Sequence, residues 1–241
     1  MVIYRKKRSD KATELIVKHY QDLTTHELYE ILKTRSEIFV VEQNCVYQDL
    51  DDKDQNAIHV FCWNEEGRVA ACLRVFMKDE AAGVAQIGRV VTLIHGKGLG
   101  GTILHKAVEI ARDYYHANKI YLEAQQYAIG YYGKEGFIVT SEPFLEDGIP
   151  HVQMELELDR VTRIRKMEAI YDRVKAESEK AQRNEEAIQK DLVSLEAYYT
   201  SGLWKEDFVA DEEGQLPADL KRGVLSEDGI YNLIEAFNGS E

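Results

Sequence analysis

A glycine-rich loop between an apolar run and a helical pattern limits the possible folds of this chain more than any other segment. The segment IGRVVTLIHGKGLGGTILHKA spans residues 87–107 and carries four glycines within residues 96–101. Glycine permits positive φ and close backbone approach, so successive N–H groups can converge on one anion at a helix N-terminus. Hydrogen bonds to a charged group contribute roughly 1.5–3 kcal/mol each. The loop therefore predicts a phosphate cradle that needs no cationic side chain.

Two nucleotide motifs compete for this loop. The nucleotide-triphosphate pattern requires a hydroxyl residue after its lysine, but Lys97 is followed by Gly98, so that pattern is not met. The dinucleotide pattern G-x-G-x-x-G is met by Gly96, Gly98 and Gly101. Glu123 follows at the sequence spacing expected for the acidic residue that binds the ribose. A nicotinamide-dependent enzyme therefore stays an alternative, although the preceding 85 or so residues do not read as alternating βαβ units.

Charge and hydropathy exclude several classes of protein. The 241 residues have a formal net charge of −13, so we expect no nucleic-acid partner, and an acidic surface suits cationic partners such as amines. No stretch could span a membrane, and no signal peptide is predicted at the N-terminus. The three cysteines, Cys45, Cys62 and Cys72, lack metal-type spacing and indicate free thiols in the cytoplasm. We expect no metal site.

Residues 1–158 read as a mixed α/β domain. A β-rich stretch at 14–21 precedes Thr24 and Glu27, which form a capping box that opens a helix over 26–39. Apolar stretches at 57–63 and 68–77 flank NEEG and predict a hairpin. A helix follows the glycine loop from 99, and strands are predicted at 119–125 and 151–158.

Residues 159–241 read as a helical module. No Gly or Pro occurs from 159 until Gly202, and apolar residues recur at steps of three and four from Val161 to Tyr199. The apolar pattern weakens at Ser178 and Glu185. We expect one helix of about 40 residues that either projects as a coiled coil or folds back on itself, and a last helix capped by Ser226. The domain boundary is placed between 158 and 159.

Residues 15–158 resemble the GNAT acetyltransferase superfamily, and within it the small bacterial ElaA-like proteins. The segments that carry the resemblance are RSEIFVVEQNCVYQDLDDKD (35–54), IGRVV (87–91), HGKGLGG (95–101), YLEAQ (121–125), YYGKEGF (131–137) and EDGIPHVQMEL (146–156). The resemblance implies an α+β fold, with a mixed and mostly antiparallel central sheet flanked by helices. It also implies an N-acetyltransferase that moves an acetyl group from acetyl-CoA, its cosubstrate, to an amine by direct attack in a ternary complex.

The resemblance assigns the cofactor site to the loop and the strand before it. The pantetheine arm is expected along the strand end and the pyrophosphate on loop backbone groups, which gives the residues Val90, Val91, Thr92, His95, Gly96, Lys97, Gly98, Leu99, Gly100 and Gly101. This chain has His95 where the family usually has Arg or Gln. The connection from Thr92 to the loop is also about two residues shorter than usual. A degenerate GNAT domain that serves as a CoA-binding or scaffold protein is therefore the alternative function.

Acetyl transfer to an amine requires a base for the nucleophile and an acid for the leaving thiol. Tyr132 occupies the position of the GNAT tyrosine in YYGKEGF, so we expect it to be the acid. Glu123, at the end of a predicted strand, is the expected base, with Glu42 and His59 as alternatives.

The acidic loop at 47–54 is the candidate acceptor side of the cleft. Tyr47, Asp49 and Asp51 are the expected substrate-binding residues, and a solvated loop is the other interpretation. Arg74 and Arg89 lie within apolar strands, where an unpaired charge is costly, so we expect them to form core ion pairs.

Residues 160–241 resemble an uncharacterised bacterial domain of unknown function, on the segments MEAIYDRV (167–174) and 195–234. This module contains no Cys/His cluster, nucleophile pair or glycine cradle. We therefore expect an interaction or regulatory module, with a homodimer or a protein partner bound through its long helix. The acetyl acceptor itself cannot be read from the motifs.

Overall fold

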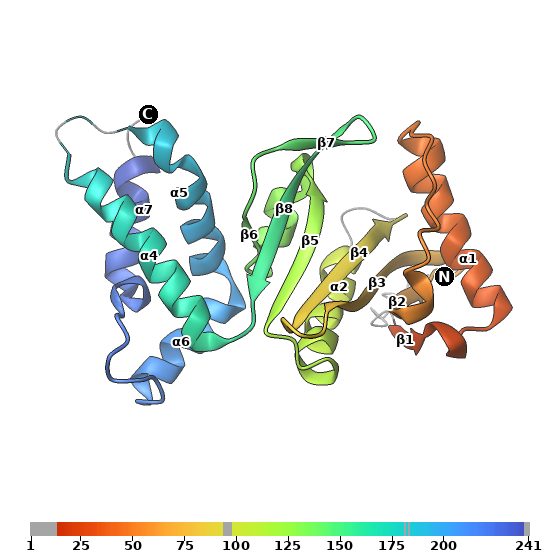
Figure 1. Ribbon diagram of the computed structural model, residues 1–241, viewed down its shortest axis with the longest axis horizontal. Helices are drawn as coiled ribbons and strands as arrows, with labels where there is room; N and C mark the ends of the chain where they lie inside the picture. Colours follow the sequence, from red (N-terminus) through yellow and green to blue (C-terminus); the bar gives the residue numbers. More distant parts are fainter. Residues whose placement is uncertain (1–13, 94–97, 181, 183, 239–241) are drawn as a thin grey trace, which may run out of the picture.

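The computed structural model describes residues 14–93, 98–180, 182 and 184–238. A sheet with flanking helices occupies the first part of the chain, and a group of helices follows it beside the sheet (Figure 1). His95, Gly96 and Lys97 of the predicted cradle lie outside the described residues. No helix in the described part of the chain is long and apolar enough to cross a membrane.

Eight strands form one sheet in the order β1-β2-β3-β4-β5-β8-β6, with β7 paired to β8. The strands are β1 (Ile16–His19), β2 (Ile58–Trp63), β3 (Val69–Asp79), β4 (Val84–Thr92), β5 (Lys119–Gln125), β6 (Ile138–Val139), β7 (Phe144–Glu146) and β8 (Ile149–Glu157). Within the described residues only β4 and β5 pair in parallel. The expected mostly antiparallel sheet is therefore confirmed, and the repeated parallel units of a dinucleotide-binding fold are not present there.

The parallel pair β4 and β5 diverges after three residues. Val84, Ala85 and Gln86 pair with Lys119, Ile120 and Tyr121, and no further pairs join the two strands. Both strands continue, to Thr92 and Gln125, and they separate as two arms of a V (Figure 1). Backbone N–H and C=O groups of β4 are therefore left without a strand on that side.

Helices cover both faces of the sheet. The first, α1 (Thr25–Arg35), begins at the predicted capping box, since the Thr24 side chain accepts from the Glu27 N–H and the Glu27 carboxylate accepts from the Thr24 N–H. It continues as a π-helical segment, η2 (Ser36–Glu42). On the other face lies α2 (Leu99–Glu109), which continues as a π-helical segment over Ile110–Tyr114. The short α3 (Ile129–Gly133) follows β5.

The alternation of side chains along the strands gives each helix its own part of the core. Phe61, Cys72 and Val91 pack with Ile31 of α1. Their neighbours in the sequence, such as Val60 and Leu73, pack in the larger cluster that contains Ile103, Leu104 and Ala107 of α2. The sheet is thus a rigid platform between two helical layers, with the V-shaped gap at its centre.

The C-terminal module is helical, as predicted, but its long helix is interrupted. It contains α4 (Arg160–Ser178), α5 (Glu185–Thr200), α6 (Gly202–Glu212) and α7 (Glu227–Asn238). The break falls between Ser178 and Glu185, where the apolar pattern weakens, and α5 folds back against α4 (Figure 1). The expectation of a single projecting helix was therefore wrong, and folding back was the correct alternative. Ser226 caps α7 by accepting from the Gly229 N–H at 3.2 Å.

This module packs against the edge of the sheet. Ile138 of β6 belongs to the apolar core of the module, together with residues such as Ile164, Leu195 and Trp204. A Cβ placed on Gly133 of α3 would lie 3.4 Å from the Ala197 Cβ of α5. Helix α3 is therefore held between the sheet and α5.

Candidate active site

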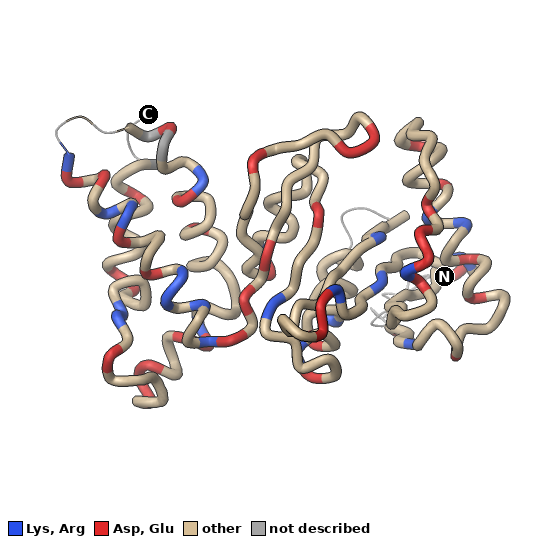
Figure 2. Tube along the Cα trace, in the orientation of Figure 1, with Lys and Arg blue, Asp and Glu red and all other residues tan. Residues whose placement is uncertain are grey.

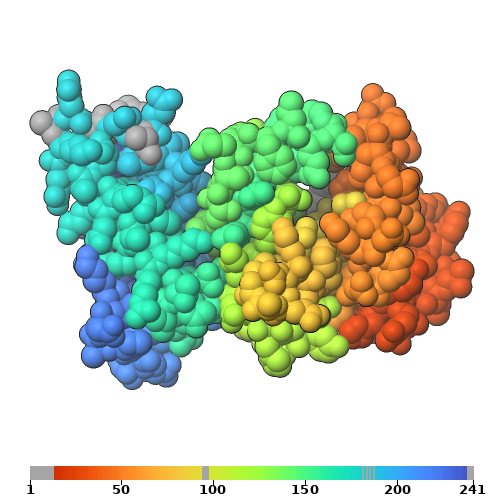
Figure 3. All heavy atoms as spheres, viewed as in Figure 1, coloured from red at the N-terminus to blue at the C-terminus, as the bar shows by residue number. Residues whose placement is uncertain are grey.

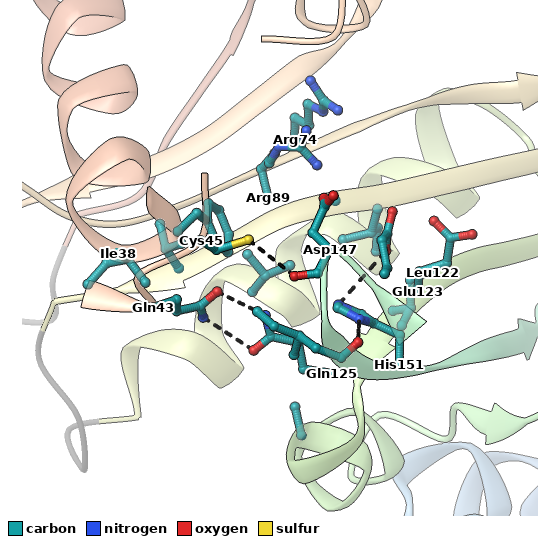
Figure 4. A pocket seen from close by; sticks show the side chains of 18 of the residues that line it. Ile38, Gln43, Cys45, Arg74, Arg89, Leu122, Glu123, Gln125, Asp147 and His151 are labelled. Atoms are coloured by element: carbon teal, nitrogen blue, oxygen red, sulfur yellow. Dashed lines mark hydrogen bonds and ion pairs between the residues drawn. The ribbon is translucent and has the colours of Figure 1, made fainter. Parts of the chain in front are cut away.

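The diverging strands open a cavity of about 560 Å³ at the centre of the sheet. Its walls come from η2 and the loop after it, from β3 and β4, from the first turn of α2, from β5 and α3, and from the β7–β8 hairpin. Residues that line it include Ile38, Gln43, Cys45, Tyr47, Asp51, Arg74, Arg89, Val90, Val91, Thr92, Gly100, Glu123, Gln125, Tyr132, Asp147 and His151 (Figure 4). Segments far apart in the sequence thus meet at one site.

The β4 wall of the cavity offers backbone hydrogen-bonding groups. Val91 and Thr92 pair on one side with Cys72 and Ala71 of β3, and on the other side they face the gap left by β5. Val90, Val91 and Thr92, the residues expected to hold the pantetheine arm, all line the cavity. An extended chain with amide groups could therefore add to this edge as a strand does.

The N-terminus of α2 lies at the same cavity. Gly98 is the residue before the helix and has φ +75°, a conformation in which a side chain is strained. A Cβ on Gly100 would lie 3.1 Å from the Tyr131 hydroxyl oxygen, so glycine permits this close packing. The N–H groups of the first turn have no partner within the helix, and the helix dipole adds positive potential there. Gly98, Leu99, Gly100 and Gly101 are thus placed to bind an anion.

Tyr132 lies in α3 and lines the cavity. Its side chain is 8% exposed and packs edge-to-face against Tyr131 and Phe137. The hydroxyl makes no hydrogen bond to another described residue. Burial raises the pKa of Tyr132 well above its usual value, so the phenol keeps its proton at neutral pH. The residue therefore combines a packing role with a protonated donor at the cavity.

The candidate bases are not equivalent in the structure. Glu123 lies on β5, is exposed to solvent, and accepts a hydrogen bond of 2.7 Å from the Tyr121 hydroxyl. It lines the cavity, whereas neither Glu42 nor His59 does. His59 is buried beside the Asp54 carbonyl, and burial holds its pKa below the usual value. Of the three, only Glu123 is brought to the cavity.

A cluster of three arginines and three aspartates lies beside the cavity, at the wall formed by the loop after η2 and by β3 and β4. Arg35, 1% exposed, donates from Nε to Asp49 at 3.0 Å and from Nη1 to Asp54 at 2.7 Å. Arg74 donates twice to the Asp51 carboxylate, each at 2.6 Å. Sequence reasoning missed Arg35, because its position on an amphipathic helix gives no sign of buried partners.

Arg89 completes this cluster through a β-bulge. Between the pairs Cys72–Val91 and Arg74–Gly88, β4 contains one residue more than β3, and Arg89 adopts φ +55°. Its Nε donates to Asp49 Oδ1 at 2.7 Å. The expected ion pairs of Arg74 and Arg89 are thus confirmed.

The residues predicted for the acceptor take part in the same cluster. The Tyr47 hydroxyl donates to Asp49 at 2.9 Å, and Asp49 is only 6% exposed and does not line the cavity. Tyr47 and Asp51 do line it. Burial favours a raised pKa for Asp51, but the hydrogen bonds and charge of Arg74, with the charge of Arg89, outweigh it and hold that pKa well below its usual value. These aspartates are therefore neutralised by arginine.

The opposite wall carries acidic groups without such partners. Glu123, Glu146 and Asp147 line the cavity, and none of them forms an ion pair with a described lysine or arginine. Glu146 lies 3.9 Å from the His151 ring. Asp147 is at the tight turn between β7 and β8, with φ +49°, and Figure 2 shows this acidic turn. Although EDGIP is part of a segment that carries the family resemblance, its sequence gives no sign that its carboxylates form a wall of the cavity.

Two contacts join the walls across the cavity. The Gln43 and Gln125 side chains exchange two amide hydrogen bonds, and the Cys45 thiol donates to the Asp147 carbonyl at 3.6 Å (Figure 4). All three cysteines are free. Burial raises the pKa of the Cys72 thiol to about 12, so this thiol is inert. The described residues contain no group of His, Cys, Asp and Glu that could hold a metal ion.

Known proteins resemble the two parts of the chain separately. A family model described as an acetyltransferase (GNAT) domain matches residues 18–158, and a model for a domain of unknown function, DUF4298, matches residues 164–240. Protein ElaA of Escherichia coli is 34% identical over 144 residues, which are 58% of this chain and 94% of that protein. An uncharacterized N-acetyltransferase of Bacillus subtilis, YjcF, is 35% identical over 131 residues, 53% of this chain and 91% of that protein.

Solved structures agree with these sequence matches. An acyl-CoA N-acyltransferase from Pseudomonas aeruginosa superposes with a TM-score of 0.56 at 38% identity, over 60% of this chain and 99% of that one. The crystal structure of Escherichia coli ElaA gives a TM-score of 0.57 at 32% identity, over 60% of this chain and 99% of that one. Since the GNAT model matches residues 18–158 of 241, the chain belongs to the GNAT acetyltransferase family and is an acyltransferase that carries a C-terminal DUF4298 domain.

Proposed function

We propose that this acyltransferase moves an acetyl group from acetyl-CoA to an amine, by direct attack in a ternary complex. The observation that carries the proposal is the divergence of β4 from β5 beside the N-terminus of α2. It combines an anion site, an unpaired strand edge and a cavity in one place. A cavity of about 560 Å³ has room for a thin acyl-carrying arm and a small part of a second substrate.

The described residues fit two parts of acetyl-CoA, its pyrophosphate and its pantetheine arm. The pyrophosphate would accept hydrogen bonds from backbone N–H groups at Gly98, Leu99, Gly100 and Gly101, and we extend this role to His95, Gly96 and Lys97. The amides of the pantetheine arm would pair with Val90, Val91 and Thr92. When bound, acetyl-CoA supplies the activated acetyl thioester.

We assign Tyr132 the role of acid. A thiol with a pKa of about 8.5 leaves more readily when a donor protonates its sulfur. Burial keeps the Tyr132 phenol protonated, so the donor is present across the neutral range. Neighbouring N–H groups on the β4 edge would polarise the thioester carbonyl.

We assign Glu123 the role of base, directly or through water. An alkylamine with a pKa of about 10.4 is about one part in a thousand neutral at pH 7.4, so its proton must be removed. Glu123 lines the cavity from the wall opposite β4. Tyr47 and Asp51 line the acceptor side, and Asp49 holds the Tyr47 hydroxyl in place.

We further propose that the C-terminal module is an interaction or regulatory unit that binds a second copy or a protein partner. The support is its contact with α3, the helix that carries Tyr132. A partner that shifted α5 would shift the support of α3.

The test is turnover of acetyl-CoA with a panel of primary amines, and the readout is the release of the free thiol of CoA. The proposal predicts release that depends on both substrates. Binding of acetyl-CoA without transfer to any amine would favour the alternative, a scaffold that holds CoA.

A further inference from the structure

Polar side chains lie at every second position along one face of β5. Tyr121, Glu123 and Gln125 alternate with residues of the apolar core, because successive side chains of a strand point to opposite faces of the sheet. Glu123 and Gln125 line the cavity, whereas Tyr121 does not and is 8% exposed. Gln125 is already paired with Gln43. Glu123 is therefore the carboxylate that β5 presents to the cavity, with Tyr121 beside it.

Tyr121 lies at the point where the two parallel strands part. It pairs with Gln86 of β4 in the last of the three pairs that join β4 and β5, and with Glu155 of β8 on the other side. The ammonium nitrogen of Lys78 lies 3.3 Å from the centre of the Tyr121 ring and is attracted to its face. Glu123 follows two residues later, beyond the last pair with β4. A residue held on several sides thus precedes a carboxylate that extends into the gap.

A hydrogen bond joins this fixed residue to the carboxylate. The Tyr121 hydroxyl donates to Glu123 Oε1 at 2.7 Å. Burial, followed by the hydrogen bond to Glu123, raises the pKa of Tyr121 above its usual value, so the hydroxyl keeps its proton and donates it to the bond. No described residue donates a hydrogen bond to Glu123 Oε2. One carboxylate oxygen is therefore held within the protein, and the other is available to an occupant of the cavity.

The hydrogen bond matters because the Glu123 side chain is exposed. Figure 3 shows a hollow between the orange segment of η2 and the green β7–β8 hairpin, and both segments contribute walls to the cavity. An unrestrained glutamate on such a surface samples many rotamers. A base is effective only within hydrogen-bond reach of the proton that it removes. The bond to Tyr121 restricts the carboxylate to positions near the fixed ring.

We propose that Tyr121 is a positioning residue, whose hydroxyl holds the Glu123 carboxylate so that Oε2 meets the acceptor amine. This inference rests on the proposed function, in which Glu123 is the base. Tyr121 takes no part in the proton transfer and keeps its own proton throughout.

The transfer is balanced by the groups already assigned. The alkylammonium loses one proton to Glu123 Oε2, and the freed electron pair of nitrogen forms the bond to the thioester carbonyl carbon. The C–S bond breaks with its electron pair on sulfur, which takes a proton from Tyr132. The second proton that nitrogen loses, as the amide forms, replaces the one that Tyr132 gave. Glu123 returns its proton to water.

The experiment uses the full chain with one hydroxyl removed at a time. Tyr121→Phe keeps the ring and its contact with Lys78 and removes the bond to Glu123. Tyr115→Phe is the matched control, since that hydroxyl donates to the Val75 carbonyl at 3.4 Å and Tyr115 does not line the cavity. The two acceptors, at about pH 7.4, are ethylamine, which is almost wholly protonated, and trifluoroethylamine, which its fluorines keep mostly neutral.

We expect Tyr121→Phe to lower kcat for ethylamine at least tenfold, because a base must first remove the ammonium proton. The kcat for trifluoroethylamine, which reaches the cavity already neutral, should stay within twofold, and so should the Kd for acetyl-CoA in titration calorimetry. The control should keep both kcat values and the Kd within twofold. An equal loss with both acceptors, or no loss with either, would overturn the inference.

A double variant separates positioning from an independent effect on the fold. Glu123→Gln should slow ethylamine more than Tyr121→Phe does. Adding Tyr121→Phe to it should change kcat by less than twofold, because no base is left for the hydroxyl to hold. A further tenfold loss in the double variant would overturn the inference.

The inference and the proposed function fail in different ways. Slow ethylamine turnover in Glu123→Gln with unchanged turnover in Tyr121→Phe would overturn the inference and leave the proposed function standing. Unchanged turnover in Glu123→Gln would overturn the inference together with the assignment of the base. Absence of acetyl-CoA binding by the unmodified chain would overturn the proposed function itself.

Discussion

Gln43 and Gln125 join the two walls of the cavity through a reciprocal pair of amide hydrogen bonds, of 3.2 and 3.1 Å. The two residues are 82 positions apart and come from the end of η2 and the end of β5. Both side chains line the cavity, so the bridge crosses it from the η2 side to β5. Hence it ties the end of η2 to the end of β5 beside the cavity.

This bridge predicts strong coupling between two substitutions. We expect Gln43→Ala and Gln125→Ala each to lower the free energy of unfolding by about 1 kcal/mol, because each removes the same pair of hydrogen bonds. The double variant should cost little more than either single one, which gives a coupling energy of about 1 kcal/mol in urea unfolding. Additive effects would show that the bridge does not hold the walls together.

Removing the hydroxyl group should have different effects at two adjacent tyrosines: a loss of turnover at Tyr132 and a gain of stability at Tyr131. Tyr132→Phe should lower kcat at least tenfold and leave the Kd for acetyl-CoA within twofold, since we propose that the phenol protonates the leaving thiol. The Tyr131 hydroxyl is buried without a hydrogen-bond partner among the described residues. Tyr131→Phe should therefore raise the free energy of unfolding by about 1 kcal/mol. Unchanged turnover in Tyr132→Phe would remove that residue from the mechanism.

The buried arginine–aspartate cluster predicts a steep loss of stability at low pH. Burial favours a raised pKa for Asp54, but Arg35 and Arg74 outweigh it and lower that pKa. The stabilisation is therefore complete above the unfolded-state pKa of about 3.9 and is lost as the pH falls through the lower folded-state pKa. Urea unfolding between pH 7 and pH 3 measures it.

A variant of the same cluster tests this account at neutral pH. Asp54→Asn removes a buried negative partner of Arg35 and should lower the free energy of unfolding by about 3 kcal/mol at pH 7. The variant should also lose part of the acid-dependent slope. Asp172→Asn, which removes an exposed ion pair with Lys221, is the control and should change little. Equal effects of both variants would mean that burial does not strengthen the cluster.

The contact between the C-terminal module and the sheet domain predicts that alanine lowers the free energy of unfolding by different amounts at two glycines. Gly136 and Gly148 have φ of +89° and +83°, so alanine is strained by about 1 kcal/mol at either position. A Cβ on Gly136 would also lie 3.0 Å from Leu203 of α6, whereas nothing lies within 4 Å of one on Gly148. Gly136→Ala should therefore cost about 1 kcal/mol more than Gly148→Ala. In a Leu203→Ala background the difference should shrink in thermal unfolding to the part caused by Leu156, which lies 3.3 Å from the same Cβ.

Local chemistry explains what the sequence could predict. The Thr24–Glu27 capping box, the hairpin between β2 and β3, and the glycine before α2 each depend on residues a few positions apart. The break at 179–184 was visible as a weakened apolar pattern, but local periodicity could not decide between one helix and two.

Contacts between residues far apart in the chain explain what the sequence could not predict. The charges of Asp49 and Asp51 suggested attraction of an amine, yet Arg89 meets Asp49 across 40 residues and Arg74 meets Asp51 across 23. The acidic wall at Glu146 and Asp147 likewise exists only because the β7–β8 hairpin folds over β5. Charge patterns alone do not show which carboxylates remain unpaired.

Thermal unfolding with acetyl-CoA, CoA, NAD and NADH in parallel tests whether the gap between β4 and β5 binds acetyl-CoA. A ligand at about 100 times its Kd stabilises the folded state by about 2.7 kcal/mol. We expect a raised Tm with acetyl-CoA and CoA and an unchanged Tm with NAD and NADH. A raised Tm with a nicotinamide dinucleotide alone, or with none of the four, would contradict it.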